Sequence, residues 1–420
     1  MSKKENSKTT TPISEIEYPH IIPDTWIWKR LGECGTFISG YTPKQLELSD
    51  SGLIPYFKVS DMNRESNQKY MKTSLLFMAD GSNNTKKVFS KGTIVYPKNG
   101  GALFTNKKRI LVSDSVVDLN TGGFLPNSEL DTEYMYLYFL NIDFRKCHKG
   151  SALPTIDQEK LRNYLVPVPP LEEQKRIVAR IEELFSELDA AVATLEQTKE
   201  QLAVYRQAVL KEAFEGEWTY QLVTDVISSD KHSMVIGPFG SDLKVSDYCE
   251  SGVPLVFVKD IRDNFSDKPR EYVSVEKAEK LSAHKVSYGD LLITKMGNPP
   301  GDCVIYPNNV DAIITADCIK VTVNPEIVNA KYLMYYILSS FGKRQVDEMT
   351  CGVAQKKMSL KRFKSFTLPK ISLLEQDEIV SEIESHLSVC DKIEETVNTA
   401  LQEAEAMRQS ILKQAFAGEL

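Results

Sequence analysis

Two long stretches of the chain place apolar or small residues alternately three and four positions apart. A stripe with this spacing predicts a helix whose apolar side packs against a partner helix. The stripe residues are Ile181, Leu184, Leu188, Leu195 and Leu202 in the first stretch, and Ile383, Ile393, Val397, Met407 and Ile411 in the second. We therefore predict two helices of about forty residues, each roughly 60 Å long at 1.5 Å per residue, that form a coiled coil.

The ends of both helices carry recognisable signals. Pro169-Pro170 precede the first helix, and Ser372 with Glu375 forms a capping box at the start of the second. Gly216 and Gly418 suit the helix C-termini because glycine adopts the left-handed conformation without strain. The start and end signals are spaced similarly in both stretches, so we predict two helices of similar length.

The chain contains an internal repeat. Residues 171–217 and 373–419 align without a gap at an offset of 202, and 18 of the 47 aligned positions are identical. Weaker matches precede each helix: residues 92–98 resemble 289–295, and Tyr134 with Tyr138 resembles Tyr332 with Tyr336. The order is therefore domain, helix, domain, helix.

The segments between the helices consist of short β-branched runs broken by Gly, Pro and Asn, with one short helical pattern in each. We predict two α/β (α+β) domains joined by a long antiparallel two-helix coiled coil, with a pseudo-two-fold relation between the repeats. The predicted boundaries are a disordered tail at 1–16, a first domain at 17–167, a spacer helix at 168–217, a second domain at 218–370 and a C-terminal spacer helix at 371–420.

Charge is distributed unevenly along the 420 residues, whose net charge is −7. The helical segments 168–217 and 371–420 carry −5 and −8, whereas the domain segments 17–167 and 218–370 carry +3 and +2. Nucleic-acid binding by the domains is therefore compatible with an acidic chain. The seven cysteines are scattered singly, and no apolar run is long enough for a membrane span, so we expect a reduced, cytoplasmic protein.

The sequence of residues 167–178, Pro-Val-Pro-Pro-Leu-Glu-Glu-Gln-Lys-Arg-Ile-Val, runs directly into the first acidic helix. This segment resembles the conserved region of type I restriction-modification specificity subunits. A degenerate copy follows Leu373, and the segments 23–32 and 236–241 add to the resemblance. The second copy departs from the family pattern, because Lys370-Ile371-Ser372 replaces the double proline.

The resemblance implies a DNA-binding targeting subunit with no chemistry of its own. Each target recognition domain would read one half of a bipartite, asymmetric sequence in double-stranded DNA, and the helices would set the gap and dock the other subunits. The expected partners are two adenine-N6 methyltransferase (modification) subunits and the restriction/translocase subunits, acting in DNA methylation and defence against foreign DNA. S-adenosylmethionine, Mg²⁺ and ATP would bind to these partners, and no cofactor to this chain.

Basic clusters in the two domain segments are candidate phosphate contacts. They are Lys86, Lys87, Lys98, Lys107, Lys108, Arg109, Lys295, Lys343, Arg344, Lys356 and Lys357. Asn106 and Gln355 stand beside such clusters and are candidates for reading base edges. The alternatives are a solvated charged surface for the lysines and an ordinary turn for the asparagine.

The residues give no sign of catalysis or metal binding. The chain has no Walker loop, no Gly-x-Ser-x-Gly motif and no cluster of histidines. Asn298-Pro299-Pro300-Gly301 resembles the adenine-methyltransferase tetrapeptide but lacks its final aromatic residue, so it indicates a turn. We therefore predict no catalytic and no metal site. The alternative function is a coiled-coil interaction scaffold without DNA specificity, against which stand the similarity of the two domains and their basic clusters.

Overall fold

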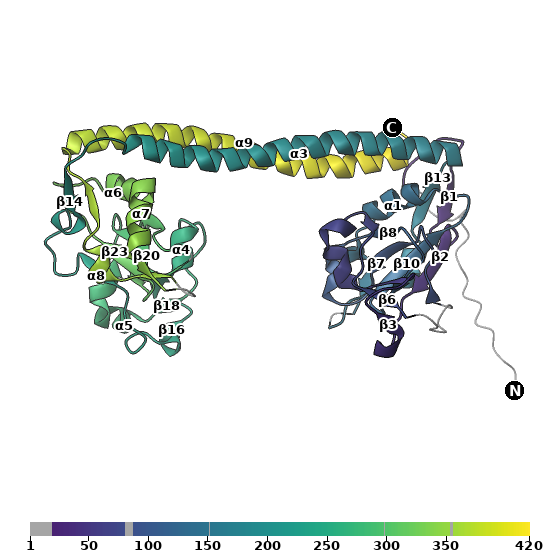
Figure 1. Ribbon diagram of the computed structural model, residues 1–420, viewed down its shortest axis with the longest axis horizontal. Helices are drawn as coiled ribbons and strands as arrows, with labels where there is room; N and C mark the ends of the chain where they lie inside the picture. The colour runs from purple at the N-terminus through teal and green to yellow at the C-terminus, as the bar shows by residue number, and fades with distance from the viewer. Residues whose placement is uncertain (1–18, 80–86, 151, 298, 353–355) are drawn as a thin grey trace. The chain divides into compact units, whose positions relative to one another are not determined.

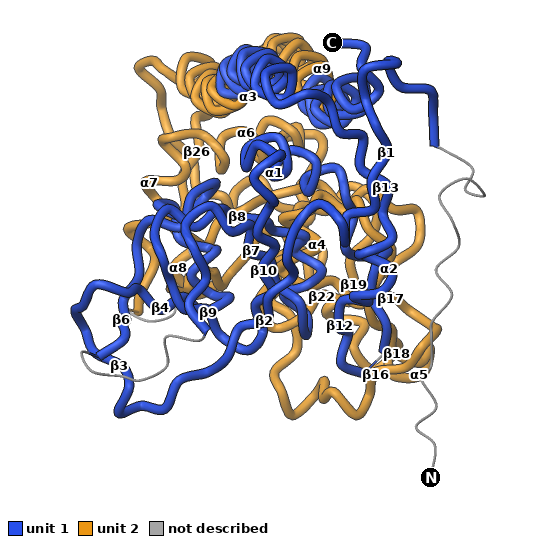
Figure 2. The backbone as a smooth tube through the Cα atoms, turned by 90° about the vertical axis from the view of Figure 1, so that its right-hand side faces the viewer, with its two compact units in different colours: residues 1–194, 400–420 blue, residues 195–399 orange. Residues whose placement is uncertain are grey.

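The computed structural model describes residues 19–420 except 80–86, 151, 298 and 353–355. These residues form two compact units (Figure 2): one reaches Thr194 and includes Ala400–Leu420, and the other comprises Leu195–Thr399. The two long helices, α3 (Leu171–Ala213) and α9 (Leu373–Ala417), each contribute to both units (Figure 1). The predicted class, two α/β domains joined by long helices, is confirmed. The predicted tail at 1–16 lies outside the described residues.

The first domain contains a five-stranded sheet in the order β2-β10-β7-β8-β5 and a four-stranded sheet in the order β3-β6-β4-β9. Its elements are β1 (Ile27–Arg30), β2 (Gly35–Ser39), β3 (Leu48–Ser49), β4 (Pro55–Phe57), β5 (Tyr70–Met71), β6 (Leu76–Met78), β7 (Ile94–Pro97), β8 (Arg109–Leu111), β9 (Val116–Val117), β10 (Thr121–Pro126), α1 (Thr132–Asn141), β11 (His148–Lys149), β12 (Thr155–Ile156), α2 (Gln158–Arg162) and β13 (Leu165–Val168). Strand β13 pairs with β1, so the first domain extends to Val168.

The second domain repeats this plan with sheets in the orders β15-β23-β20-β21 and β16-β18-β17-β22-β19. Its elements are β14 (Tyr220–Leu222), β15 (Met234–Ile236), β16 (Tyr248–Cys249), β17 (Val253–Val256), α4 (Val258–Arg262), β18 (Tyr272–Val273), α5 (Val275–Lys280), β19 (Lys285–Val286), β20 (Leu291–Thr294), β21 (Cys303–Ile305), β22 (Ala312–Ile314), β23 (Cys318–Val321), α6 (Ala330–Leu338), α7 (Ser340–Met349), β24 (Thr350–Cys351), β25 (Lys357–Met358), α8 (Leu360–Phe363) and β26 (Thr367–Pro369). The central strands β7 and β20 are buried along their whole length, which explains their continuous apolar sequences.

Aromatic side chains attach each domain to the long helices. Phe416 of α9 packs edge-on against Tyr134 and Tyr138 of α1, with ring centroids 5.3 and 5.2 Å away. In the other unit, Phe214 packs edge-on against Tyr332 and Tyr336 of α6 at 5.4 and 5.1 Å. Phe214 and Phe416 match at the offset of 202 and the tyrosines at an offset of 198, so the sequence repeat encodes one packing arrangement that occurs twice.

A buried glutamine fixes the start of each long helix to its domain. The Gln174 side-chain oxygen accepts a hydrogen bond from the Asp131 backbone N–H, and its amide nitrogen donates to the carbonyls of Glu129 and Pro169. Gln376 makes the equivalent three bonds to Asn329, Ile327 and Ile371. Both side chains are fully buried, and each glutamine uses its buried amide to bond three backbone groups outside the helix and sheet ladders.

The long helices run antiparallel within each unit. In the first unit Arg408 forms an ion pair with Asp189, and in the second Arg206 pairs with Asp391 at 2.7 Å and with Glu394 at 2.9 Å. Asp189 and Asp391 occupy equivalent repeat positions, as do the two arginines. The helix interface therefore contains a repeated ionic contact that a purely apolar stripe does not include.

Most of the predicted stripe residues are buried or half-buried at the helix interface, but two of them are exposed. Ile181, Leu202, Ile383, Val397 and Ile411 are buried. Three more predicted stripe residues, Leu184, Leu188 and Leu195, are half-buried. Ile393 and Met407 are 40% and 54% exposed, which corrects the prediction that they face the partner helix. The next residue in each case, Glu394 and Arg408, contacts the other long helix instead. The Arg408 guanidinium lies 4.6 Å from the Phe185 ring centroid.

Candidate DNA interface

The same backbone construction follows the central strand in both domains. After β7, the Lys98 carbonyl accepts a hydrogen bond from the Ile156 N–H (2.9 Å), and the Gly100 N–H donates to the Pro154 carbonyl (2.8 Å). After β20, the Lys295 carbonyl accepts from the Met358 N–H (2.9 Å), and the Gly297 N–H donates to the Lys356 carbonyl. In each domain, two equivalent backbone hydrogen bonds thus join the loop after the central strand to a short hairpin.

We name these hairpins by their residues: hairpin one is 148–156 (β11–β12) and hairpin two is 350–358 (β24–β25). They are equivalent at the repeat offset, and each carries a glycine at the same position, Gly150 with φ 83° and Gly352 with φ 106°. Positive φ at this point of a hairpin favours glycine, which accounts for its presence in both copies. The side chains around the glycine differ between the copies, so the backbone is repeated and the chemistry is not.

Four predicted phosphate contacts lie on this construction. Lys356 and Lys357 are exposed on hairpin two, and Lys98 and Lys295 are half-buried at the ends of the central strands. Partial burial lowers the pKa of Lys98 because desolvation penalises the charged ammonium. The structure thus brings Lys295 close to Lys356 and Lys357, which stand far from it in the sequence. His148 and Lys149 are exposed on hairpin one, and sequence reasoning does not select His148 as a site residue. The glycine repeated at offset 202 is the signal that could identify His148.

The structure contradicts the prediction that Lys108 and Arg109 are surface phosphate contacts. Lys108 is 1% exposed, donates to the Ile142 carbonyl at 2.7 Å and to the Asn106 side chain at 2.8 Å, and lies 4.3 Å from the Phe144 ring centroid. Desolvation lowers its pKa to about 7. Arg109 is 7% exposed and donates to three backbone carbonyls. Both side chains therefore bond groups inside the domain and do not face DNA.

Asn106 is also part of this internal network. Its side-chain oxygen accepts hydrogen bonds from the Lys108 ammonium and from the Phe144 N–H, and its backbone has φ 55°. Asparagine tolerates this left-handed conformation better than most residues. The turn alternative therefore describes Asn106, and the prediction that it reads bases is corrected.

The other predicted contacts are dispersed. Lys87 is exposed over the Tyr41 ring at 4.6 Å, and Lys107 bonds the Asn63 side chain. Arg344 is exposed on α7, and Lys343 donates to Gln207 of α3 at 2.9 Å, so it faces the long helix rather than hairpin two. The candidates Lys86 and Gln355 lie outside the described residues.

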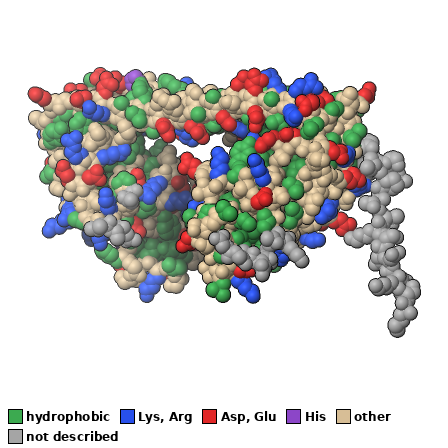
Figure 3. All heavy atoms as spheres, turned by 45° about the vertical axis from the view of Figure 1, so that its right-hand side comes forward, with side chains coloured by type: hydrophobic (Ala, Val, Ile, Leu, Met, Phe, Trp, Pro, Cys, Tyr) green, Lys and Arg blue, Asp and Glu red, His purple; other side chains and the backbone are tan. Residues whose placement is uncertain are grey.

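The long helices present a different surface from the hairpins. Figure 3 shows acidic side chains along them, with basic side chains interspersed. Exposed members include Glu172, Glu183 and Asp391. A phosphate backbone is repelled by such a surface, whereas a partner protein with basic groups is attracted.

Residues 23–202 and 256–403, which cover most of the chain, match the type I restriction modification DNA specificity domain. The chain belongs to the type I restriction modification DNA specificity family. This family member is similar to the specificity subunit of the type I restriction enzyme EcoKI from Escherichia coli strain K12, with 24% identity over 95% of this chain and 90% of that protein. It is also similar to the EcoBI specificity subunit from Escherichia coli, with 28% identity over 63% of this chain and 60% of that protein.

Two solved structures share the fold of this specificity family member. One was solved to explain complex assembly and conformational transition of the type I R-M system. It has a TM-score of 0.74 and 18% identity, and the match covers 96% of this chain and all of that one. The other is the HsdS subunit from Thermoanaerobacter tengcongensis, with a TM-score of 0.56, 19% identity and coverage of 96% and 99%. The family match and the curated relatives identify the chain as a type I DNA specificity subunit, and the scaffold alternative is not favoured.

Two further observations concern the described residues of this specificity subunit. They contain no group of three or more His, Cys, Asp or Glu side chains arranged to hold a metal ion. Among the helices within those residues, none combines the length and apolar character that crossing a bilayer requires.

Proposed function

We propose that each domain reads one half of a bipartite, asymmetric DNA sequence through its loop and hairpin. The observation that carries this proposal is that hairpins one and two share the same backbone bonds and turn glycine but carry different side chains. A two-stranded ribbon of this size fits the major groove, where each base pair presents a distinct pattern of donors and acceptors. Equivalent backbones with different side chains suit two unlike half-sites.

The long helices provide the spacing between the half-sites and the docking surface for the other subunits. They set the unread gap between the half-sites, and their acidic surfaces dock two adenine-N6 methyltransferase subunits and, through them, the restriction/translocase subunits. Those partners carry out the chemistry with S-adenosylmethionine, Mg²⁺ and ATP, in the cytoplasm. The acidic surface of the long helices supports the docking part of this proposal.

The test is co-expression with the methyltransferase subunit, followed by mapping of methylated adenines by long-read sequencing. We expect one bipartite motif with a fixed gap. The variant Lys356→Ala/Lys357→Ala in hairpin two is expected to weaken or relax one half-site only, and His148→Ala/Lys149→Ala in hairpin one the other. The absence of new methylation from an assembled, soluble complex would refute the proposal.

The spacer role has its own test. Inserting four residues into both helices at matched heptad positions lengthens the pair by about 6 Å. At about 3.4 Å per base pair, the recognised gap is then expected to grow by one to two base pairs. An unchanged gap in the methylation map would show that the helices do not set the spacing.

A further inference from the structure

Domain one closes one edge of its main sheet with a strand of its own. Strand β5 pairs in parallel with β8, and the Ile110 N–H donates to the Lys69 carbonyl at 2.9 Å. The Lys69 ammonium then reaches Glu133 of α1 at 2.9 Å and Glu182 of α3 at 2.7 Å, and the Tyr70 hydroxyl donates to Glu133. Burial alone would lower the pKa of Lys69, but the hydrogen bonds to both carboxylates outweigh it and raise that pKa.

Among the residues of domain two that the structure describes, no strand takes this place, and β21 is the edge of the sheet. Ile305 pairs with Leu291 as Ile110 pairs with Ile94. The next residue, Tyr306, donates its N–H to the carbonyl of Asp290, the residue before β20. Because hydrogen-bonded and non-bonded pairs alternate in an antiparallel ladder, the Ile305 N–H points away from β20. The donor that β5 satisfies in domain one therefore faces the open edge in domain two.

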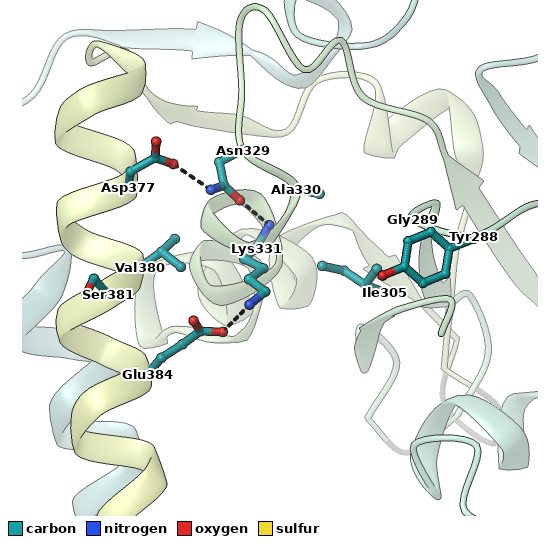
Figure 4. Close-up of a pocket in the computed structure, with 10 residues that line it drawn as sticks. All are labelled: Tyr288, Gly289, Ile305, Asn329, Ala330, Lys331, Asp377, Val380, Ser381 and Glu384. Atoms are coloured by element: carbon teal, nitrogen blue, oxygen red, sulfur yellow. Dashed lines mark hydrogen bonds and ion pairs between the residues drawn. The ribbon is translucent and has the colours of Figure 1, made fainter. Parts of the chain in front are cut away.

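A cleft of about 510 Å³ lies at this edge. Ile305 of β21 and Tyr288, in the turn between β19 and β20, stand on one side, and Asp377, Ser381 and Glu384 of α9 on the other (Figure 4). The cleft occupies the place that corresponds to Lys69 and Tyr70 in domain one, because Glu384 is equivalent to Glu182 at the repeat offset. The Tyr288 side chain is 69% exposed.

The lining of the cleft carries a net negative charge. Lys331 occupies the position of Glu133 and pairs directly with Glu384 at 2.6 Å, and the Asp377 carboxylate accepts a bond from the Asn329 side chain at 2.7 Å. Two carboxylates and one ammonium thus line the cleft, the same balance that Lys69 forms with Glu133 and Glu182 in domain one. A net negative cleft repels DNA and favours a basic peptide.

We propose that an extended segment of the methyltransferase subunit fills this cleft and adds to β21 as a fifth strand. This inference rests on the proposed function as a specificity subunit. The segment accepts the Ile305 N–H on a backbone carbonyl, directs a Lys or Arg toward Asp377 and Glu384, and packs an aromatic residue against Ile305. It reproduces from another chain what Lys69 and Tyr70 supply within domain one. Strand addition of this kind takes affinity from main-chain bonds and specificity from side-chain pockets.

Photo-crosslinking in the assembled complex tests this proposal. A benzoylphenylalanine is placed at Ser381 and, as the matched control, at Ala179, which is its equivalent at the repeat offset and is also exposed on its helix. We expect position 381 to crosslink to a methyltransferase segment that contains a basic and an aromatic residue, and position 179 to crosslink within its own chain near Lys69. A complex that assembles but crosslinks at 381 only to DNA, to a second copy of this chain or to nothing would overturn the inference while leaving the proposed function intact.

A second measurement gives the strength of the contact. The substitution Ser381→Trp fills the cleft and is expected to weaken methyltransferase binding by about tenfold. Glu279→Trp on α5, an exposed position outside the cleft, is the control and is expected to leave binding unchanged. Equal affinities of the two variants would refute the inference. If the unmodified chain did not bind the methyltransferase at all, the proposed function itself would fail, and this inference with it.

Discussion

Replacing Gln376 with methionine tests how firmly the second domain is fixed to α9. Methionine has a similar length but forms none of the three hydrogen bonds, at 2.8, 3.1 and 3.1 Å, that the glutamine makes to Asn329, Ile327 and Ile371. Each lost bond costs about 1 kcal/mol, and a stranded buried group costs about 1–3 kcal/mol. Since Ile327 is 40% exposed, water can replace part of the loss there, and we expect a total near the low end, about 3 kcal/mol.

Hydrogen exchange measures this loss locally, which matters because a chain with two units need not unfold in one step. A loss of about 3 kcal/mol corresponds to roughly a hundredfold faster exchange at the start of α6, where the Asn329 N–H loses its acceptor. Gln402→Met is the control, because Gln402 is exposed on the same helix. If both variants exchanged within about threefold of the unmodified chain, the glutamine would contribute little and the reasoning from buried bonds would be refuted.

Three further predictions concern cations. The folded-state pKa of Lys108, about 7, lies below that of the unfolded chain, so the unfolded chain binds more protons between these values and stability rises with pH from about 7 toward 10. Lys108→Met is expected to abolish this rise, which urea unfolding at pH 7 and pH 9 measures. A midpoint that still increases with pH in the variant would contradict the prediction. Lys356→Ala/Lys357→Ala is expected to reduce the slope of log affinity for DNA against log salt by about two, and an unchanged slope would remove both residues from the interface. Arg206→Ala breaks two ion pairs with exposed carboxylates, so we expect a loss of at most about 1 kcal/mol in urea unfolding, vanishing at 1 M salt; a larger, salt-independent loss would indicate packing instead.

The repeat made most of the architecture predictable from the sequence. Both long helices and the two-domain order followed from a period of seven and an offset of 202. The details of the helix interface did not follow, because hydrophobicity does not select a charged residue such as Arg408. Its guanidinium lies over the Phe185 ring and forms an ion pair with Asp189. Ile393 was chosen for its apolar side chain, although Glu394 is the residue that faces Arg206.

The site was less predictable than the fold. A run of basic residues does not reveal which side chains point inward, and Lys108 with Arg109 turned inward to bond backbone carbonyls. Hairpins one and two have too few residues to produce a strand pattern, and only the bonds from the central-strand loops to residues 154 and 356 show that they are parts of one construction. Tertiary contacts of this kind carry no local sequence signal.

The open edge of β21 makes the two halves of the chain unequal to a partner that uses it. In domain one, Lys69 and Tyr70 already occupy the equivalent place. An incoming subunit therefore finds one open binding site, in domain two, and one that is filled by the chain itself. Two copies of the same methyltransferase would then load in sequence rather than together. At limiting methyltransferase, the one-to-one complex should accumulate with its single partner on the second domain, and assembly would have a defined first step although the subunits that assemble are identical.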